Sequence, residues 1–164
     1  MPQDTKNKVV NALIELAEQN PEKSYFTFSE IAKQAGLSRQ AIYKKHFSNV
    51  EEIIEYIRQS IMAPFIPLYE SYAEGSKENP LIFFAKHMIP AIYEHRQWMK
   101  VLYTTAIDPF WREYIASFFT QWVTDNLDIN AKKMGIPQEM GTEIIVKWIN
   151  SLIEIWIIKE ELSR

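Results

Sequence analysis

Four side chains of types that bind nucleic acid follow a glycine near the amino end of this chain. Arg39, Gln40, Tyr43 and Lys44 all belong to one short stretch with helical character. An arginine can bond guanine O6 and N7 or a phosphate, and a glutamine can pair with adenine N6 and N7. Tyrosine and lysine commonly hold phosphate oxygens. A helix that carries this set predicts contact with both the base edges and the backbone of duplex DNA.

Cap residues at fixed spacings predict the two short helices that would position these side chains. Thr27 and Glu30 form a capping box, which predicts a helix starting at that point. Gly36 stands where the chain must take a left-handed turn to leave the helix, and Ser38 can cap the next one. Residues 27–47 therefore predict a helix-turn-helix.

This stretch resembles the amino-terminal signature of the TetR/AcrR family of transcriptional regulators, and the resemblance covers about the first third of the chain. It implies a dimeric, all-helical repressor with a DNA-reading head and a carboxy-terminal body that senses a small molecule. The residues that carry the resemblance are Phe28, Ile31, Ala32, Ala35, Gly36, Leu37, Ser38, Ile42, Tyr43 and Phe47. The residues expected to bind DNA are Thr27, Ser38, Arg39, Gln40, Tyr43, Lys44, Lys45 and His46. For His46 a phosphate contact and a packing role are both open.

The chain departs from the family pattern after Tyr43, because Phe47 comes one residue later than the usual aromatic. On an ideal helix Lys45 would then fall on the face that packs inward. A buried, unpaired ammonium is costly. We therefore expect the helix to end near Lys44 or Lys45, or the Lys45 side chain to reach out to solvent.

A second departure is Val50, where the family often has a lysine that contacts a phosphate. Backbone N–H groups at the helix start after Ser48 can replace that contact, because a helix amino terminus favours anions. Glu51 and Glu52 compete for the same positive end of the helix.

Charge and composition narrow the classes of function. Residues 31–50 hold four basic side chains and no acidic one, a local charge of +4 within a chain of net charge −3. This asymmetry is expected when one end of a protein meets phosphate. The chain has no cysteine, four glycines and none of the phosphate-binding, zinc-protease or nucleophile motifs of common enzymes, so we expect no enzyme, no cofactor and no metal site. His87 and His95 are too far apart for the usual paired-ligand spacing.

The amino-terminal residues contain no apolar signal region, and the uncharged runs are too short to cross a bilayer. Together with the absence of cysteine from the sequence, these features predict a soluble, cytoplasmic protein.

Helical periodicity continues through the chain, and no alternating run bounded by a hairpin turn indicates a strand. We expect a head over residues 1–47, a connecting helix with a proline break over 48–73, and a helical body over 80–164, separated by a polar loop at 74–79. The first helix is expected to end at Asn20-Pro21, and a capping box of Ser48 and Glu51 is expected to start the connecting helix, which Pro64 and Pro67 then break. In the body we expect helices over 81–93 and 98–105, a long helix from Asp108-Pro109 to Lys133, and a last helix from Pro137.

The last two predicted helices have apolar arcs wider than one face, which indicates two partners. Either both helices are buried in the core, or they form a four-helix bundle with a second subunit, as the resemblance implies. The second alternative places a dimer interface at Trp122, Ile145, Trp148, Ile149, Leu152 and Trp156.

The resemblance also implies an effector pocket, for which an apolar or aromatic, weakly charged molecule is the expected ligand. Aromatic residues of the body are the candidates, although aromatics at helical spacing also serve as ordinary core. The candidate residues are Tyr93, Trp98, Tyr103, Phe110, Trp111, Tyr114 and Phe118.

The sequence thus predicts a sequence-specific DNA-binding regulator that forms a homodimer on a palindromic operator. The alternative is a helical interaction module that binds protein through the same fold. The exposed basic set of Arg39, Lys44 and Lys45 favours DNA, because a protein-binding version would show apolar residues there.

Overall fold

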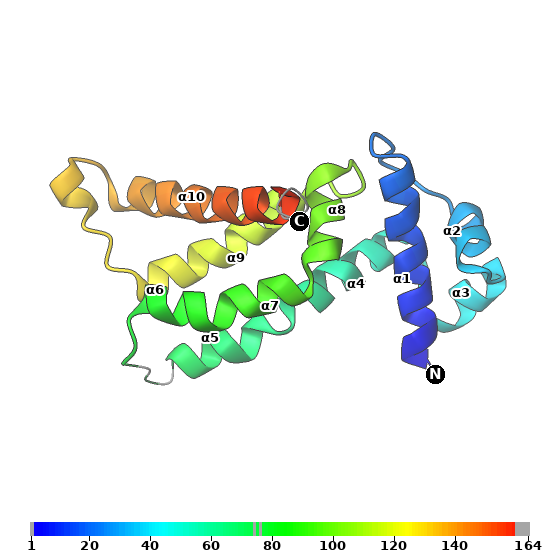
Figure 1. The fold of residues 1–164 in the computed structure, drawn as a ribbon, viewed down its shortest axis with the longest axis horizontal. Helices are drawn as coiled ribbons and strands as arrows, with labels where there is room; N and C mark the ends of the chain where they lie inside the picture. The colour runs from blue at the N-terminus through cyan, green and yellow to red at the C-terminus, as the bar shows by residue number, and fades with distance from the viewer. Residues whose placement is uncertain (1, 74, 76, 160–164) are drawn as a thin grey trace. The chain divides into compact units, whose positions relative to one another are not determined.

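The computed structural model describes residues 2–73, 75 and 77–159, with side chains described from Thr5 on and without that of Lys45. The described chain is helical and contains no strand, which confirms the expected all-α class (Figure 1). It forms two compact units. The head unit is the chain up to Pro64 together with Gln97–Pro109, and the body unit is Phe65–Arg96 with the described chain from Phe110 onward.

The head unit contains four consecutive helices and most of a fifth. They are α1 (Pro2–Gln19), α2 (Phe28–Ala35), α3 (Arg39–Lys45), α4 (Val50–Met62) and α8 (Arg96–Thr104). The first helix ends before Asn20-Pro21 as expected, since the residue before a proline disfavours helical geometry. Apolar side chains from several of these helices meet in one core, which includes Val9, Leu13, Phe26, Ile31, Ile42, Ile53 and Ile57.

The body unit is built from α5 (Phe65–Ala73), α6 (Pro80–Phe83), the π-helical turn η1 (Phe84–Met88), α7 (Ile89–Glu94), α9 (Trp111–Asn126), the 3-10 turn η2 (Ala131–Met134) and α10 (Gln138–Lys159). Helices α9 and α10 pack against each other along the unit (Figure 1). Its largest buried side chains include Phe65, Met88, Trp111, Phe119 and Trp122.

Prolines set several of the boundaries. Helix α4 ends at Met62, before Pro64, and Pro67 lies in the first turn of α5, where its missing N–H costs nothing. The helix expected over 81–93 is interrupted by η1, which ends two residues before Pro90. A π turn rearranges the hydrogen bonds of a helix locally. Here it lies in the turn that the backbone N–H of residue 90 would bond, a group that a proline does not have.

The long helix expected to reach Lys133 is a wrong prediction, since α9 ends at Asn126 and Leu127 is extended. The Asn126 side chain donates to the Trp122 carbonyl at 2.9 Å, a local bond that competes with helix continuation. Gly135 does terminate a helical turn, with φ 70, but that turn is η2.

Two expected caps are also wrong. Asn49, not Ser48, caps α4, with its side-chain oxygen 2.8 Å from the Glu52 nitrogen. Asp108 does not cap α9, because its carboxylate is held by Arg58 instead.

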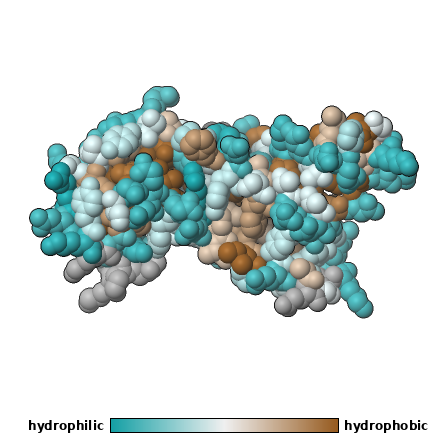
Figure 2. Space-filling view, turned by 180° about the vertical axis from the view of Figure 1, so that it is seen from behind, coloured by the Kyte–Doolittle hydropathy of each residue, from teal (hydrophilic) through white to brown (hydrophobic). Residues whose placement is uncertain are grey.

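No helix among the described residues combines the length and apolar character that crossing a membrane would need. On the face seen in Figure 2, hydrophilic residues surround smaller apolar patches.

Candidate nucleic-acid interface

The turn between α2 and α3 has the caps that the sequence predicts. Thr27 Oγ1 accepts from the Glu30 nitrogen at 3.3 Å, and the Glu30 carboxylate accepts from the Thr27 nitrogen at 2.8 Å. Gly36 adopts the left-handed region with φ 66 and ψ 31. The Leu37 nitrogen then bonds the Ala32 carbonyl at 2.9 Å, which closes the end of α2. The capped turn fixes the direction in which α3 leaves α2.

Glu30 is also the most strongly shifted carboxyl group of this region. The hydrogen bond from the Lys23 ammonium, followed by that from the Thr27 backbone, lowers its pKa to about 2. Hydrogen bonds donated to a carboxylate favour its ionised form. The capping box is therefore held in its charged, bonded state at neutral pH.

Helix α3 presents one buried and one exposed face. Ser38 caps it, with Oγ accepting from the Ala41 nitrogen at 3.1 Å. Ile42, on the inner face of the same helix, is fully buried. The exposed residues of this helix include Arg39, Gln40, Tyr43 and Lys44. All four of the side chains singled out for their chemistry therefore face solvent.

Two of these side chains are held by α2. Arg39 Nη1 donates to Ser29 Oγ at 3.1 Å. The Tyr43 ring, 51% exposed, packs against the Phe28 ring with centroids 4.4 Å apart. Sequence reasoning did not single out Ser29, whose only signal is its place in the first turn of the preceding helix. These contacts reduce the entropy that Arg39 and Tyr43 would lose on binding a ligand.

A polar hollow of about 380 Å³ lies beside this exposed face, where the starts of α2 and α4 approach α3. It combines hydroxyl groups, an amide and one guanidinium, which are donors that suit phosphate oxygens, with the carboxylate of Glu51, which repels them. The residues that line it are Tyr25, Thr27, Phe28, Ser29, Arg39, Tyr43, Ser48, Asn49, Val50 and Glu51.

The extra residue after Tyr43 is accommodated by an early end of α3. The helix ends at Lys45, as expected, and His46 takes φ −134 and ψ −56. This non-helical step brings Phe47 into the core, where its ring lies 5.6 Å from that of Tyr56. His46 is half-buried, and its buried Nδ1 has no hydrogen-bond partner among the described residues. The Lys45 side chain lies outside the described residues.

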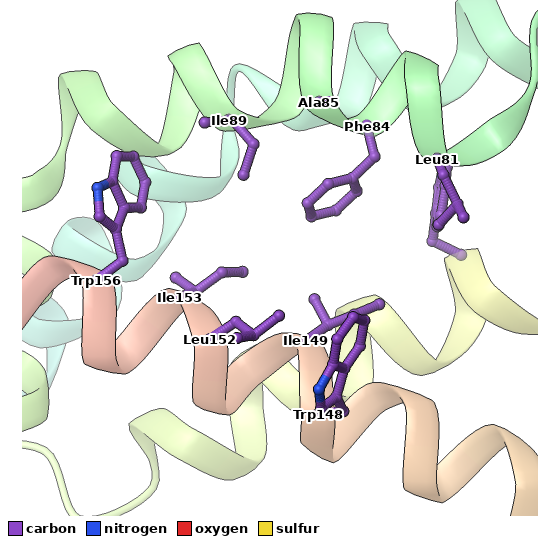
Figure 3. Close-up of a pocket in the computed structure, with 10 residues that line it drawn as sticks. Leu81, Phe84, Ala85, Ile89, Trp148, Ile149, Leu152, Ile153 and Trp156 are labelled. Carbon is purple, nitrogen blue, oxygen red and sulfur yellow. The ribbon is translucent and has the colours of Figure 1, made fainter.

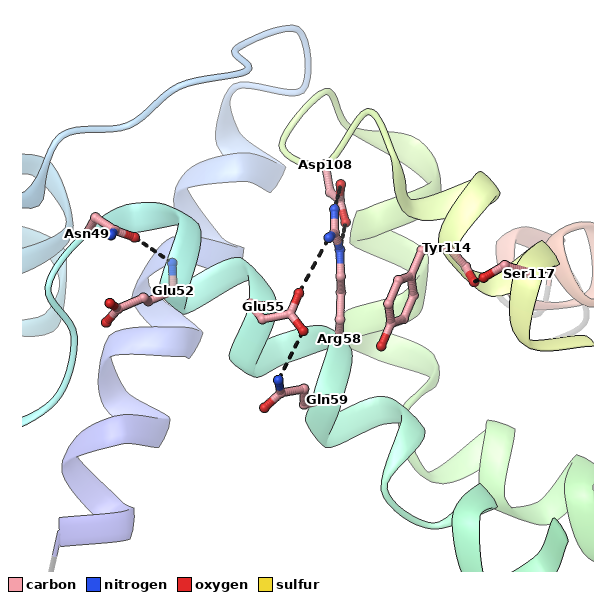
Figure 4. A network of polar contacts seen from close by, with 8 residues as sticks. All are labelled: Asn49, Glu52, Glu55, Arg58, Gln59, Asp108, Tyr114 and Ser117. Carbon is pink, nitrogen blue, oxygen red and sulfur yellow. Dashed lines mark hydrogen bonds and ion pairs between the residues drawn. The ribbon is translucent and has the colours of Figure 1, made fainter.

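The start of α4 offers fewer anion-binding donors than the sequence suggests. Val50 is buried, so it is not at a phosphate-contacting surface. The Ser48 nitrogen bonds the Glu52 carboxylate at 2.7 Å, and the Glu52 nitrogen bonds Asn49 (Figure 4). Two backbone donors at this terminus are thus already paired with the protein's own side chains.

The residues expected to line an effector pocket do not line the apolar pocket of the body unit. Trp98 and Tyr103 belong to the head unit, and Phe110 is exposed. Trp111 is buried in the core, and Phe118 packs on the ring of Phe65 at 5.9 Å. Tyr114 is half-buried, and Tyr93 stacks on Trp156 without lining the pocket itself. Helical spacing does not distinguish aromatics that fill a core from those that border a gap.

The apolar pocket instead contains residues that were expected at a dimer interface. Trp122, Trp148, Ile149, Leu152 and Trp156 all line it, together with Leu81, Phe84, Ala85, Ile89 and Ile153. Trp122 is 0% exposed, so it has no surface to offer a partner chain. Ile145 is half-buried. Trp148 and Leu152 line the groove and are also exposed, so they form part of its rim.

Comparison with known proteins adds no relative: no family model, no curated protein and no solved structure matches this chain.

Proposed function

We propose that this protein is a sequence-specific DNA-binding regulator of transcription of the TetR/AcrR type, a repressor that a small-molecule effector releases from its operator. The observation that carries the proposal is the exposed face of α3. Its Arg39, Gln40, Tyr43 and Lys44 side chains point to solvent, and two of them are held by α2. An arginine and a glutamine next to phosphate-binding types suit a helix in the major groove.

The charge distribution supports the same proposal. The four basic residues of 31–50 stand in a stretch without acids, whereas the whole chain is acidic. Phosphate contacts supply most of the sequence-independent affinity of DNA-binding proteins. A protein-binding surface would instead have an apolar centre.

Homodimerisation through α10 is part of the proposal. Five large apolar residues recur along one exposed side of this helix, each between 48% and 59% exposed: Met140, Ile144, Trp148, Leu152 and Ile155. Residues spaced mostly four apart form a ridge that can pack into the groove of a facing helix. A two-fold dimer would present two α3 helices to half-sites about 34–36 Å apart.

A gel shift with the full chain tests DNA binding directly. We expect retardation of random duplex at low salt, lost as salt rises because counterion release drives non-specific binding. Selection of bound sequences from a random duplex pool should then yield a palindrome, which defines the half-site and the dimer together. Absence of retardation at low salt would refute the proposal and favour the protein-binding module.

A further inference from the structure

The apolar pocket of the body unit is an open groove between the α6–α7 segment and α10. Its volume is about 410 Å³, within the range of roughly 300–1,000 Å³ common for small-molecule sites. Phe84 and Ile89 extend from one side toward Ile149 and Ile153 on the other (Figure 3).

The lining of this groove is apolar and uncharged. None of the ten lining residues has an ionisable side chain. An ionised carboxylate or ammonium placed here would lose its hydration without gaining a partner from these side chains, which is strongly unfavourable. The groove therefore selects against charged ligands.

The buried indole of Trp122 carries a hydrogen-bond donor that no acceptor meets in the described part of the chain. Trp122 is fully buried and lines the groove, yet its indole Nε1–H has no acceptor among the described residues. A buried donor without an acceptor costs free energy that an incoming acceptor can recover. An acceptor oxygen that reaches this buried atom from the groove would supply the bond that Trp122 lacks.

We propose that this groove binds a neutral, elongated, apolar molecule with one hydrogen-bond acceptor, of the class of medium-chain alcohols and ketones. A second copy of the chain is the less suitable occupant. A partner helix would cover the exposed rim at Trp148 and Leu152 but would not reach the buried floor at Trp122 and Ile153. The binding is independent of DNA, and only its role in releasing the operator rests on the proposed function.

Displacement of the neutral dye 1-N-phenylnaphthylamine from the full chain measures this binding. We expect 1-decanol to displace the dye at a concentration at least about tenfold lower than decanoate or decylammonium at pH 7, because only the charged compounds must be desolvated without a partner. Equal displacement by all three, or tighter binding of a charged one, would overturn the proposal.

The proposed hydrogen bond between a ligand oxygen and the Trp122 indole is tested with two ligands of equal chain length. 2-Decanone should bind roughly three- to tenfold more tightly than 1-decene, the gain of one hydrogen bond to a previously unpaired donor. Equal affinity of the two would contradict the role of Trp122.

Two exposed positions give a matched pair of variants that are expected to fold. Leu81→Glu introduces a carboxylate at the groove rim, and Ile66→Glu introduces one at an equally exposed site in the body unit outside the groove. We expect Leu81→Glu to weaken 1-decanol binding about tenfold or more and Ile66→Glu to leave it unchanged. Equal effects of both substitutions on 1-decanol binding would refute the assignment of the binding site to this groove.

The two proposals fail separately. If 1-decanol binds but no duplex is retarded, the groove assignment stands and the regulatory function falls. If duplex is retarded but neutral ligands do not bind preferentially, the groove assignment falls alone.

Discussion

Arg39 and Lys44 share the exposed face of α3 but differ in how they are held. The Arg39 guanidinium is oriented by its bond to Ser29, whereas Lys44 is an exposed, flexible ammonium. A planar, oriented guanidinium suits bidentate recognition of a base, and a flexible point charge suits a phosphate. The two residues should therefore contribute to DNA binding in different ways.

Arg39→Ala should lower the preference for the selected operator over scrambled duplex by about 1–3 kcal/mol, the value of one good base contact. Lys44→Ala should weaken binding to both duplexes alike and reduce the salt slope by about 1. Titrations of both duplexes at several salt concentrations measure this, with Lys132→Ala, an exposed body residue, as control. Equal losses of specificity from the two head variants would contradict the assignment.

The capping box of Thr27 and Glu30 predicts how the stability of the protein changes at acid pH. Because the folded pKa of Glu30 is lowered to about 2 from an ordinary 4.5, its contribution to stability is present above pH 4.5 and is lost as the pH falls toward 2. The stability difference between the native protein and Glu30→Gln should therefore shrink over that interval. Urea unfolding between pH 6 and pH 2 measures it, and a difference independent of pH would argue against the bonded carboxylate.

Thr27→Ala should cost about 1 kcal/mol of unfolding free energy, the usual value of an N-cap. The exposed Thr124, which lies inside α9 and caps nothing, offers Thr124→Ala as control.

Among the secondary-structure elements, α4 and the segment after α8 are joined by an ion pair within the head unit. Arg58 Nε and Nη2 reach the two oxygens of Asp108 at 2.7 and 2.5 Å, and Glu55 also contacts Arg58 (Figure 4). The Asp108 side chain is 1% exposed. Nearby, the Ala106 nitrogen bonds the Pro21 carbonyl at 2.7 Å. These contacts bind a segment from the middle of the chain to the amino-terminal helices.

Asp108→Asn should destabilise the protein by about 3 kcal/mol, because it leaves the Arg58 guanidinium without its buried counter-charge. The double variant Arg58→Met with Asp108→Asn should recover part of the loss, since neither charge is then left alone. Chemical unfolding of the single and double variants gives the coupling energy. Additive losses would show that the two side chains do not act as a pair, and Asp128→Asn at an exposed site is the control.

At the scale of the whole molecule, the chain passes between its two units at three points, after Pro64, Arg96 and Pro109. Three covalent connections therefore join the unit that carries the apolar groove to the unit that carries α3. The body unit also carries the exposed stripe of α10, on which the proposed dimer depends.

Ile144→Glu combined with Ile155→Glu should convert the proposed dimer into a monomer, because two charges would be buried without partners in the helix seam. Neither residue lines the apolar groove, so ligand binding should persist. Sedimentation equilibrium measures the association, with exposed Met134→Glu as control. A native chain that is monomeric at micromolar concentration would refute the dimer.

Several elements could be predicted from the sequence because their causes are local. The Thr27–Glu30 box, the left-handed Gly36, the Ser38 cap and the helix end at Lys45 each depend on residues a few positions apart. Backbone hydrogen-bonding needs at helix ends and the conformational freedom of glycine are visible in such a window. The all-helical class and the exposed set on α3 follow from the same local periodicity.

Only the tertiary structure decided which apolar residues are buried in the core and which line the groove. None of the residues expected at the effector pocket lines the apolar groove, whereas five of the six residues expected at the interface do, and one of these, Trp122, is fully buried there. The sequence predicts Asp108 as a cap because its partner Arg58 lies 50 positions away, outside any local window. Periodicity assigns a side chain to a face of its helix, but the neighbour across that face is set by packing between elements distant in sequence.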